Sequence, residues 1–479
     1  MSRAQRSTGA ISTRDVIRHA CALFVVLLSL SACGGGTSDG SSKSTSAPTS
    51  TLPQSNGTAS ETSVPTESGA SAPLASNTDG ATTPAADVGA STPAAAVNPA
   101  LPAISIVTDG GAAIVDKETY IPGTLAITNP DGTSAFAGRT SIRGRGHSTW
   151  DMPKKPYRIK LDEKAPLLGL PSDKNWVLLA NYSDKTLLRN RSAFELGKRL
   201  DMAWTPRDVP VEVTLNGEYL GAYDLVESIR VDKNRVAIAD TDDTVAPGST
   251  GFILEINGRL DDDNCWITTH QVTLCIDTPS PASPAQVAYI KQYVQTAEDV
   301  LYSNSATDPV NGYEKYFDVA SLINWYLVNE IFKNQDAQAY SSIYLYKDVG
   351  GKLKYGPLWD FDIAAGNVNY SGAQYSLGWW IADNIWISRM KSIDPTFEPR
   401  IRARWDGQKA QQIDTLNAYI DDSAAALQES GAEQRNFTRW PILDVQVWPN
   451  PVATGSYQGE TDYMKNWLMQ RIAWLNENL

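Results

Sequence analysis

Histidine is rare in this chain, which contains only three histidines in 479 residues, and cysteine is nearly as rare with four. His19 lies within residues 1–32, a segment typical of those removed on export. A Ser–His–Asp or Cys–His triad would therefore have to use His147 or His270. The same scarcity disfavours a histidine-rich metal centre. Carboxylates, lysines and arginines are left to carry any chemistry.

Basic residues are too few to balance the acidic ones. The chain has 41 lysines and arginines against 54 aspartates and glutamates, and its net charge is −13. An acidic surface argues against nucleic acid as a partner and against a polybasic contact with a membrane. We therefore expect no nucleic-acid binding.

The N-terminal apolar run, residues 21–30, is too short to cross a membrane, which takes about 20 residues. It follows four arginines and precedes the small residues Ser31 and Ala32, a pattern that predicts a signal peptide over residues 1–32. The alternative is a buried N-terminal helix. Cys33 comes directly after Leu-Ser-Ala, which resembles the bacterial lipobox, whose cysteine becomes the lipidated N-terminus. The resemblance implies an exported, membrane-anchored lipoprotein, and Gly34 after the cysteine favours the outer membrane or cell surface.

Two cysteines remain for the exported chain. Cys265 and Cys275 lie in two β-rich segments on either side of residues 268–271. In an oxidising compartment, a disulfide that closes this hairpin is geometrically plausible. The alternative is a zinc site that adds His270, although the CxxC spacing usual for zinc is missing.

Composition divides the rest of the chain. Residues 33–99 are Ser, Thr, Ala, Pro and Gly with few large apolar side chains, which predicts a disordered tether. Residues 100–280 are rich in β-type runs with one helix after Ser183 or Asp184, and Asn216-Gly217 predicts a hairpin turn. Residues 281–479 are mostly helical in pattern. We therefore expect an α+β fold with two lobes and a cleft between them. Strands are expected at 103–107, 123–128, 141–143, 157–161, 176–180, 211–215, 219–226 and 251–256.

Three aspartates are expected to meet at one edge of this cleft. A predicted helix ends near Lys333 and leaves Asp336 in a loop, after which two short strands, 343–346 and 352–358, form a hairpin. A hairpin returns the chain to its starting end, so Asp336 and Asp360 become neighbours. Alternation in an extended chain places Asp362 on the same face as Asp360, with Phe361 in the core. Clustered carboxylates without histidine or thiolate favour Mg²⁺, Mn²⁺ or Ca²⁺. The plainer alternative is that Asp336 caps a turn and Asp360 pairs with an arginine.

This order of a helix, a loop aspartate, a short hairpin and an Asp-Phe-Asp segment resembles the catalytic core of a protein kinase. More specifically, residues 100–479 resemble the CotH family of spore-coat and secreted atypical kinases. The matching segments are RGRGHSTW at 143–150, PKKPYRIK at 153–160, WVLLANYSD at 176–184 with Arg189 and Asn190, LNGEYLG at 215–221 with Glu227, and WDFD at 359–362.

The resemblance implies a two-lobed atypical protein-kinase-like fold, with ATP and Mg²⁺ or Mn²⁺ as cofactors. It implies that Asp336 accepts the proton of the substrate hydroxyl and that Asp360, helped by Asp362, holds the metal. Lys155 or Lys160 is the candidate phosphate lysine, and strand alternation slightly favours Lys160. Glycines in the RGRG segment either let the backbone approach a phosphate or mark a tight turn. The lysine would be oriented by Glu195 or Glu227. Ser341 stands where kinases place an asparagine that binds a second metal.

Three functions are compatible with these residues. The first is an exported, lipid-anchored kinase that phosphorylates Ser or Thr of surface proteins. The second is a non-catalytic surface binding or assembly protein on a kinase-like scaffold. The third is a glycosidase with two carboxylates across a sugar cleft. Trp379, Trp380 and Trp386 would form either packed core or an exposed platform for a peptide or glycan.

Overall fold

The computed structural model describes residues 100–239 and 242–479. The signal peptide, Cys33 and the tether expected over residues 33–99 lie outside the described residues. None of the helices in the described part is both long and apolar enough to span a membrane.

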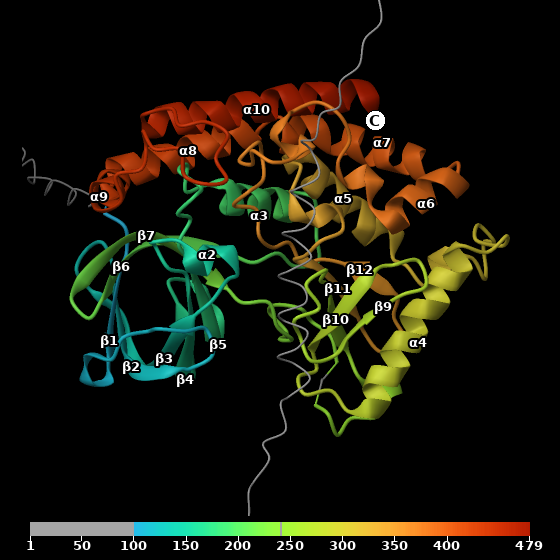
Figure 1. Cartoon of the computed structure of the whole chain (residues 1–479), viewed down its shortest axis with the longest axis horizontal. Coiled ribbons are helices and arrows are strands. Elements are labelled where there is room, and N and C mark those ends of the chain that lie inside the picture. The colour runs from blue at the N-terminus through green and yellow to red at the C-terminus, as the bar shows by residue number, and fades with distance from the viewer. Residues whose placement is uncertain (1–99, 240–241) are drawn as a thin grey trace, which may run out of the picture. The chain divides into compact units, whose positions relative to one another are not determined.

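The first third of the described chain forms a closed barrel of seven strands in the order β1-β2-β3-β4-β5-β7-β6 (Figure 1). The strands are β1 (Ala103–Thr108), β2 (Ile121–Thr128), β3 (Ser134–Gly144), β4 (Tyr157–Leu167), β5 (Leu170–Leu179), β6 (Asp208–Leu215) and β7 (Glu218–Glu227). Every neighbouring pair is antiparallel except β1 and β6, which close the barrel in parallel. Alternating residues such as Ile104, Ile106, Ile142 and Ile159 fill the barrel interior.

The expected hairpin turn is confirmed at Asn216-Gly217, between β6 and β7. Both residues have positive φ, 51° and 83°, as the two-residue turn that matches strand twist requires. Other strands are longer than the sequence predicts: β3 begins at Ser134 and β4 continues to Leu167. Of the extra residues in 134–140 and 162–167, only Thr140 and Leu167 are buried and the rest are exposed or half-buried, so these stretches lack the apolar alternation by which strands are recognised.

The second sheet has five strands in the order β12-β11-β8-β10-β9. They are β8 (Phe252–Ile256), β9 (Cys265–Ile267), β10 (Thr273–Thr278), β11 (Ile343–Lys347) and β12 (Leu353–Tyr355). The hairpin β11–β12 therefore pairs with β8, a strand that precedes residue 280, although α4 (Pro284–Leu301) and α5 (Val319–Phe332) lie between them in the chain. Cys265 and Cys275 form a disulfide between directly paired residues of β9 and β10.

Helices make up most of the C-terminal half, so the structure is mixed α+β, with a strand-rich N-terminal region and a helical C-terminal region. Two helices lie between barrel strands in the sequence, α2 (Ser148–Asp151) and α3 (Arg189–Arg199). Besides α4 and α5, the remaining helices are α6 (Ile385–Ile393), α7 (Phe397–Gln408), α8 (Leu416–Glu429), α9 (Ala432–Arg439) and α10 (Tyr457–Asn478). Helix α3 packs against the C-terminal helices α5 and α8. The almost entirely buried α5 runs through the core, and α9 packs on β7 of the barrel (Figure 1).

Candidate functional site

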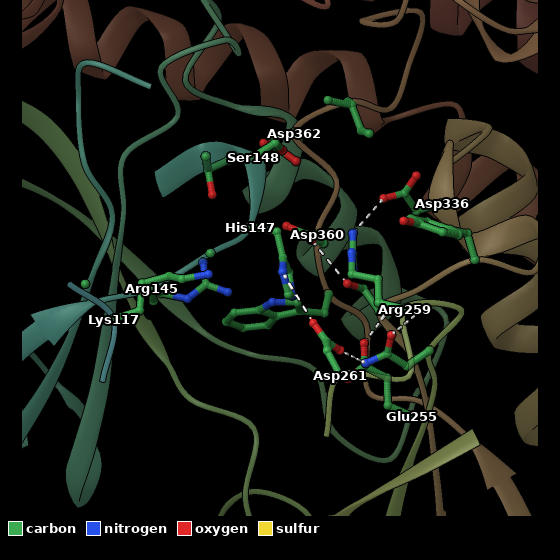
Figure 2. A pocket seen from close by; sticks show the side chains of 18 of the residues that line it. Lys117, Arg145, His147, Ser148, Glu255, Arg259, Asp261, Asp336, Asp360 and Asp362 are labelled. Carbon is green, nitrogen blue, oxygen red and sulfur yellow. Dashed lines mark hydrogen bonds and ion pairs between the residues drawn. The ribbon is translucent and has the colours of Figure 1, made fainter. Parts of the chain in front are cut away.

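A cavity of about 700 Å³ opens between the barrel and the second sheet. The barrel contributes the end of β3, the loop that follows it and part of β4. The second sheet and its loops contribute the opposite wall (Figure 2). Charged lining residues are Lys117, Glu118, Arg143, Arg145, Arg158, Glu255, Arg259, Asp261, Asp262, Asp277, Asp336, Asp360 and Asp362. All three aspartates singled out from the sequence are in this set.

Asp336 reaches the cavity because α5 ends abruptly just before it. Lys333 adopts a left-handed conformation (φ 43°), and its ammonium donates hydrogen bonds to three carbonyl groups of residues 372–377. Asp336 then begins a short 3-10 turn, η4 (Asp336–Gln338). Its carboxylate lies 4.0 Å from Arg259 Nη2 and accepts a 3.5 Å hydrogen bond from Ser341 Oγ. Burial and the charge of Asp360 raise the pKa of Asp336 to about 6, although Arg259 and Ser341 act to lower it.

Asp360 and Asp362 follow the returning strand β12, and Phe361 between them is fully buried. Both carboxylates line the cavity while the Phe361 ring is in the core, as the sequence predicts. The backbone is not an extended strand, however, because β12 ends at Tyr355 and Asp360 has a φ of +64°. Ser342 Oγ donates to Asp360 Oδ2 at 3.2 Å. Burial raises the pKa of Asp362 well above its ordinary value, and the charges of Asp360, Asp184 and Asp336 add to this effect.

The barrel side of the cavity carries cations that have no ionic partner. Arg143 and Arg158 are directly opposite each other on β3 and β4. Arg145 lies over the ring of Trp359, 5.3 Å from its centroid, and Lys117 also lines the cavity (Figure 2). Within the described residues, none of these four cations lies within 4.0 Å of a carboxylate. Like charges on paired strands destabilise a sheet, so this arrangement is suited to an anionic ligand.

The second sheet supplies further acids. Glu255 on β8 accepts the backbone N–H of Ser342 at 2.8 Å, and burial raises its pKa to about 7. Burial also raises the pKa of Asp262 and Asp277. Across the mouth of the cavity, His147 Nδ1 lies 3.7 Å from Asp261 Oδ2. The cavity therefore has a barrel wall on which four cations outnumber one acid, Glu118, and a mainly acidic opposite wall.

The structure places the two candidate phosphate lysines outside the cavity lining. Lys155 is directed at its own loop, where its ammonium donates to the carbonyl of Trp150 and lies over that residue's ring. Lys160 is exposed and lies 5.9 Å from the ring centroid of Tyr120. Arg158, which shares its strand face, is the residue that lines the cavity. Because residues i and i+2 are about 6.6 Å apart along a strand, one can reach the cavity while the other does not.

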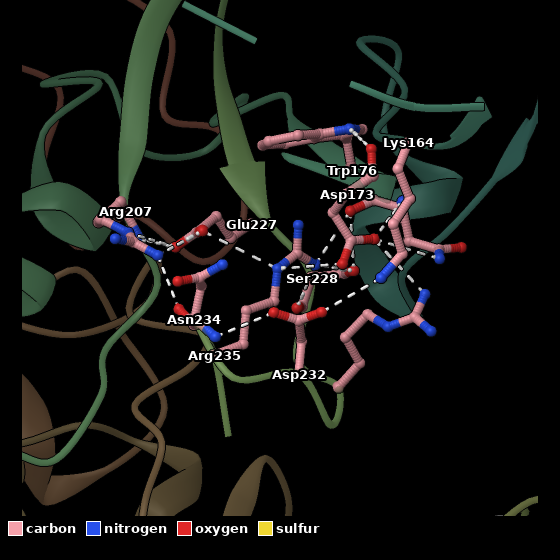
Figure 3. A network of polar contacts seen from close by, with 11 residues as sticks. Lys164, Asp173, Trp176, Arg207, Glu227, Ser228, Asp232, Asn234 and Arg235 are labelled. Carbon is pink, nitrogen blue, oxygen red and sulfur yellow. Dashed lines mark hydrogen bonds and ion pairs between the residues drawn. The ribbon is translucent and has the colours of Figure 1, made fainter. Parts of the chain in front are cut away.

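Glu227 is also outside the cavity, in a buried ionic network at the end of β7 (Figure 3). Arg207 donates two hydrogen bonds to its carboxylate, at 2.8 and 2.7 Å, and Arg235 Nε lies 3.8 Å away. Arg235 in turn lies over Trp176. These contacts fix the segment that leaves β7 onto the barrel. Glu195 likewise pairs with Arg199 one turn along α3.

Sequence reasoning missed the arginines and Glu255. The glycines of the RGRG segment have structural roles. Gly146 has a φ of +87° and marks a tight turn, and a Cβ on Gly144 would lie 2.4 Å from the Trp150 ring. Arg145 between them is the residue that faces the ligand space. The available signal was strand alternation, which places Arg158 on the same outward face as Lys160.

The cavity carboxylates suit a divalent cation that is bound together with phosphates. Within residues 100–239 and 242–479, no group of three or more His, Cys, Asp or Glu side chains is close enough to hold a metal ion by itself. Mg²⁺ is usually bound through one or two carboxylates together with substrate phosphates and water. Asp360 and Asp362 fit that arrangement, because they are neighbouring cavity carboxylates, and burial together with repulsion from Asp360 raises the pKa of Asp362.

Aromatic residues near the cavity are of two kinds. Trp386 is fully buried, Trp379 packs on Trp474, and the indole of Trp380 donates to Asn334 O, so these tryptophans are core. Tyr370 and Trp448 instead stack at the cavity edge with ring centroids 5.9 Å apart, and each is about half exposed, at 50% and 54%.

Comparison with known families gives one match over most of the described chain. Residues 142–475 match a family described as CotH kinase protein. No curated protein matches the chain.

Proposed function

The chain belongs to the CotH kinase protein family, and we propose that it transfers the γ-phosphate of ATP to Ser or Thr hydroxyls of proteins at the cell surface. In this proposal the barrel and the helical region act as the two lobes of an atypical kinase. Membership of the family implies a kinase-like phosphotransferase that uses ATP. The acceptor protein and the metal are parts of the proposal.

The observation that carries the proposal is the distribution of charge across the cavity. Four unpaired cations occupy the barrel wall, and Asp336, Asp360 and Asp362 occupy the opposite wall. A triphosphate would satisfy the cations, and a divalent cation bound to the triphosphate would satisfy the carboxylates. Phosphoryl transfer depends on this kind of positioning and charge neutralisation.

Asp336 is assigned as the general base. Its pKa of about 6 leaves it ionised at neutral pH yet basic enough to share a hydroxyl proton. As the acceptor oxygen bonds to the γ-phosphorus, the bond from that phosphorus to the bridging oxygen breaks, ADP leaves, and the hydroxyl proton passes to Asp336. Arg259, 4.0 Å from the carboxylate, helps keep it ionised.

Phosphate binding is assigned to the arginines of the barrel in place of Lys155 and Lys160. Arg143, Arg145 and Arg158 present guanidinium groups, which bind phosphate oxygens in pairs. Asp360 and Asp362 would hold Mg²⁺ or Mn²⁺, which would neutralise and orient the phosphates.

Labelled ATP tests the proposal on the whole chain. We expect label transfer to a generic protein acceptor with Mg²⁺ or Mn²⁺, and its loss in Asp336→Asn and Asp360→Asn. Asp299→Asn is the matched control, because this exposed aspartate on α4 accepts a hydrogen bond from Gln295 and does not line the cavity. Absence of transfer, with binding to a partner protein that both aspartate variants retain, would instead support a non-catalytic binding or assembly protein. The half-exposed Tyr370–Trp448 pair would suit that second function.

We also propose that the chain is exported and anchored to the membrane by a lipid on Cys33. The lipobox-like segment before Cys33 supports this proposal. Radiolabelled palmitate should enter the protein in cells, and Cys33→Ala should abolish incorporation and release the protein from the membrane fraction. Incorporation into Cys33→Ala would refute the assignment.

A further inference from the structure

A continuous chain of side-chain amides connects the barrel to the backbone between the two cavity carboxylates. Asp224 on β7 accepts a hydrogen bond from Asn181 Nδ2 at 2.7 Å. Asn181 Oδ1 accepts from Asn190 Nδ2 at 3.3 Å. Asn190 Oδ1 then accepts from the backbone N–H of Phe361 at 2.8 Å. The three side chains are all at least 91% buried, with exposed fractions of 3%, 9% and 4%.

The peptide end of this chain determines the orientation of both amides. A peptide N–H can only donate a hydrogen bond, and the NH₂ group of Asn190, which then faces Asn181, can also only donate. Asn190 must therefore turn its oxygen to Phe361, and Asn181 must turn its NH₂ group to Asp224. The amide of Asn190 is thus held in one orientation by Asn181 and presents a fixed acceptor to Phe361.

That acceptor acts on an unusual piece of backbone. Asp360 has a φ of +64°, in the left-handed region, which residues other than glycine, asparagine and aspartate seldom adopt and which is often found at functional sites. The Phe361 N–H is in the peptide unit that follows Asp360 and precedes Asp362. The hydrogen bond that this N–H donates to Asn190 Oδ1 anchors the backbone between the two carboxylates and so restricts the directions of Asp360 and Asp362 together.

The first turn of α3 also holds the far end of the same segment. Arg189 Nε donates to the carbonyl of Ala364 at 3.0 Å, and its Nη1 is paired with the buried Asp184. Asn190 and Arg189 therefore contact residues 361–364 at two points. The side chains of Asn181 and Asn190 line a small cavity together with Arg145, Asp360 and Asp362.

From this geometry we propose that Asn190 is a positioning residue, which, through Asn181 and Asp224, orients Asp360 and Asp362 toward a divalent cation in the cavity. The inference rests on the proposed function, because it concerns the cation of that reaction. It predicts that removal of Asn190 impairs cation use more than it impairs folding. Loss of a residue that orients metal ligands typically weakens metal binding about 10- to 100-fold.

The test uses the whole chain and Mn²⁺, with free Mn²⁺ measured by electron paramagnetic resonance in the presence of ADP. We expect Asn190→Ala to bind Mn²⁺ about ten-fold or more weakly, and Asn181→Ala to show a smaller loss because the Phe361 contact remains. Hydrogen exchange of the peptide containing Phe361 should accelerate in Asn190→Ala. The control is Gln286→Ala, which removes another buried amide, one that donates to Asp242 O, Val245 O and Thr250 Oγ1 far from the cavity lining.

The outcomes separate the inference from the proposed function. Unchanged Mn²⁺ affinity and unchanged exchange at Phe361 in Asn190→Ala would overturn the inference alone. An equal loss of Mn²⁺ affinity in Gln286→Ala would overturn it too, because general destabilisation would then suffice. No Mn²⁺ binding by the unsubstituted chain would overturn the proposed metal-dependent function and the inference with it.

Discussion

Replacing Arg158 by glutamine should weaken nucleotide binding strongly and change stability little. Arg158 lines the cavity, while Lys160, two residues along the same strand face, does not. A hydrogen bond between charged groups contributes about 1.5–3 kcal/mol. Because 1.4 kcal/mol is a factor of ten, Arg158→Gln should raise the Kd for ATP about 10- to 150-fold.

The free energy of unfolding should change little, because one repulsive and one attractive interaction of Arg158 oppose each other. Its repulsion from Arg143, directly opposite on β3, costs up to about 1 kcal/mol. Its attraction to Asp277 opposes that cost, since it acts to lower the carboxyl's pKa without a close ion pair. The free energy of unfolding of the variant should therefore lie within about 1 kcal/mol of the parent value.

Calorimetric titration with ATP and Mg²⁺, beside urea unfolding, measures both quantities. Lys160→Gln is the matched control, because it removes one positive charge from the same strand without altering the cavity lining. The assignment of phosphate binding to the arginines is refuted if both variants bind ATP as the parent does. It is also refuted if Lys160→Gln shows the larger loss, which would restore the lysine originally favoured from the sequence.

Three further predictions concern protons and the disulfide. Arg259→Gln removes the cation that lowers the pKa of Asp336, so the acidic limb of kcat/KM, expected near pH 6, should move to higher pH; an unmoved limb would mean that another group titrates. Burial raises the pKa of Glu255 to about 7, so the folded chain holds a proton that the unfolded chain releases at lower pH. Stability of the ligand-free protein should accordingly fall as the pH rises from 5 to 8, and Glu255→Gln, compared by thermal melts, should flatten this slope. Replacing Cys265 and Cys275 together by serine should lower the free energy of unfolding by about 2–3 kcal/mol, since the bond closes a short loop, and urea titration would show no change if the disulfide does not form.

The features that could be predicted from the sequence are those that depend on neighbouring residues. The Asn216-Gly217 turn follows from two residue types that tolerate the positive φ found at both positions. The placement of Asp336 and Asp360 in one cavity follows from the hairpin between them. Its second strand returns the chain to the end at which the first strand began. Family motifs added the kinase-like identity, which the match to residues 142–475 supports.

Features set by long-range packing could not be predicted in the same way. Whether Arg158 or Lys160 reaches the ligand space depends on where the second sheet meets the barrel, and strand alternation gives both the same face. Glu227 was a reasonable partner for a lysine, but Arg207, 20 residues earlier, and Arg235 take up its carboxylate in the fold. Ordinary sequence patterns do not specify such partners.

Asp360 and Asp362 show both kinds of feature. Strand alternation correctly predicts that the two carboxylates lie on one side, but long-range packing and not a strand places them there. Alternation in a strand would give the two carboxylates one face, yet the strand has already ended and Asp360 is in a left-handed conformation. Phe361 enters the core against Phe194 and Phe332, which anchors the turn, and the amide of Asn190 takes its N–H. A regular strand would need neither Asn190 nor its buried partners. The left-handed turn and its buried acceptor therefore hold the direction of these two carboxylates more tightly than a strand pattern alone would.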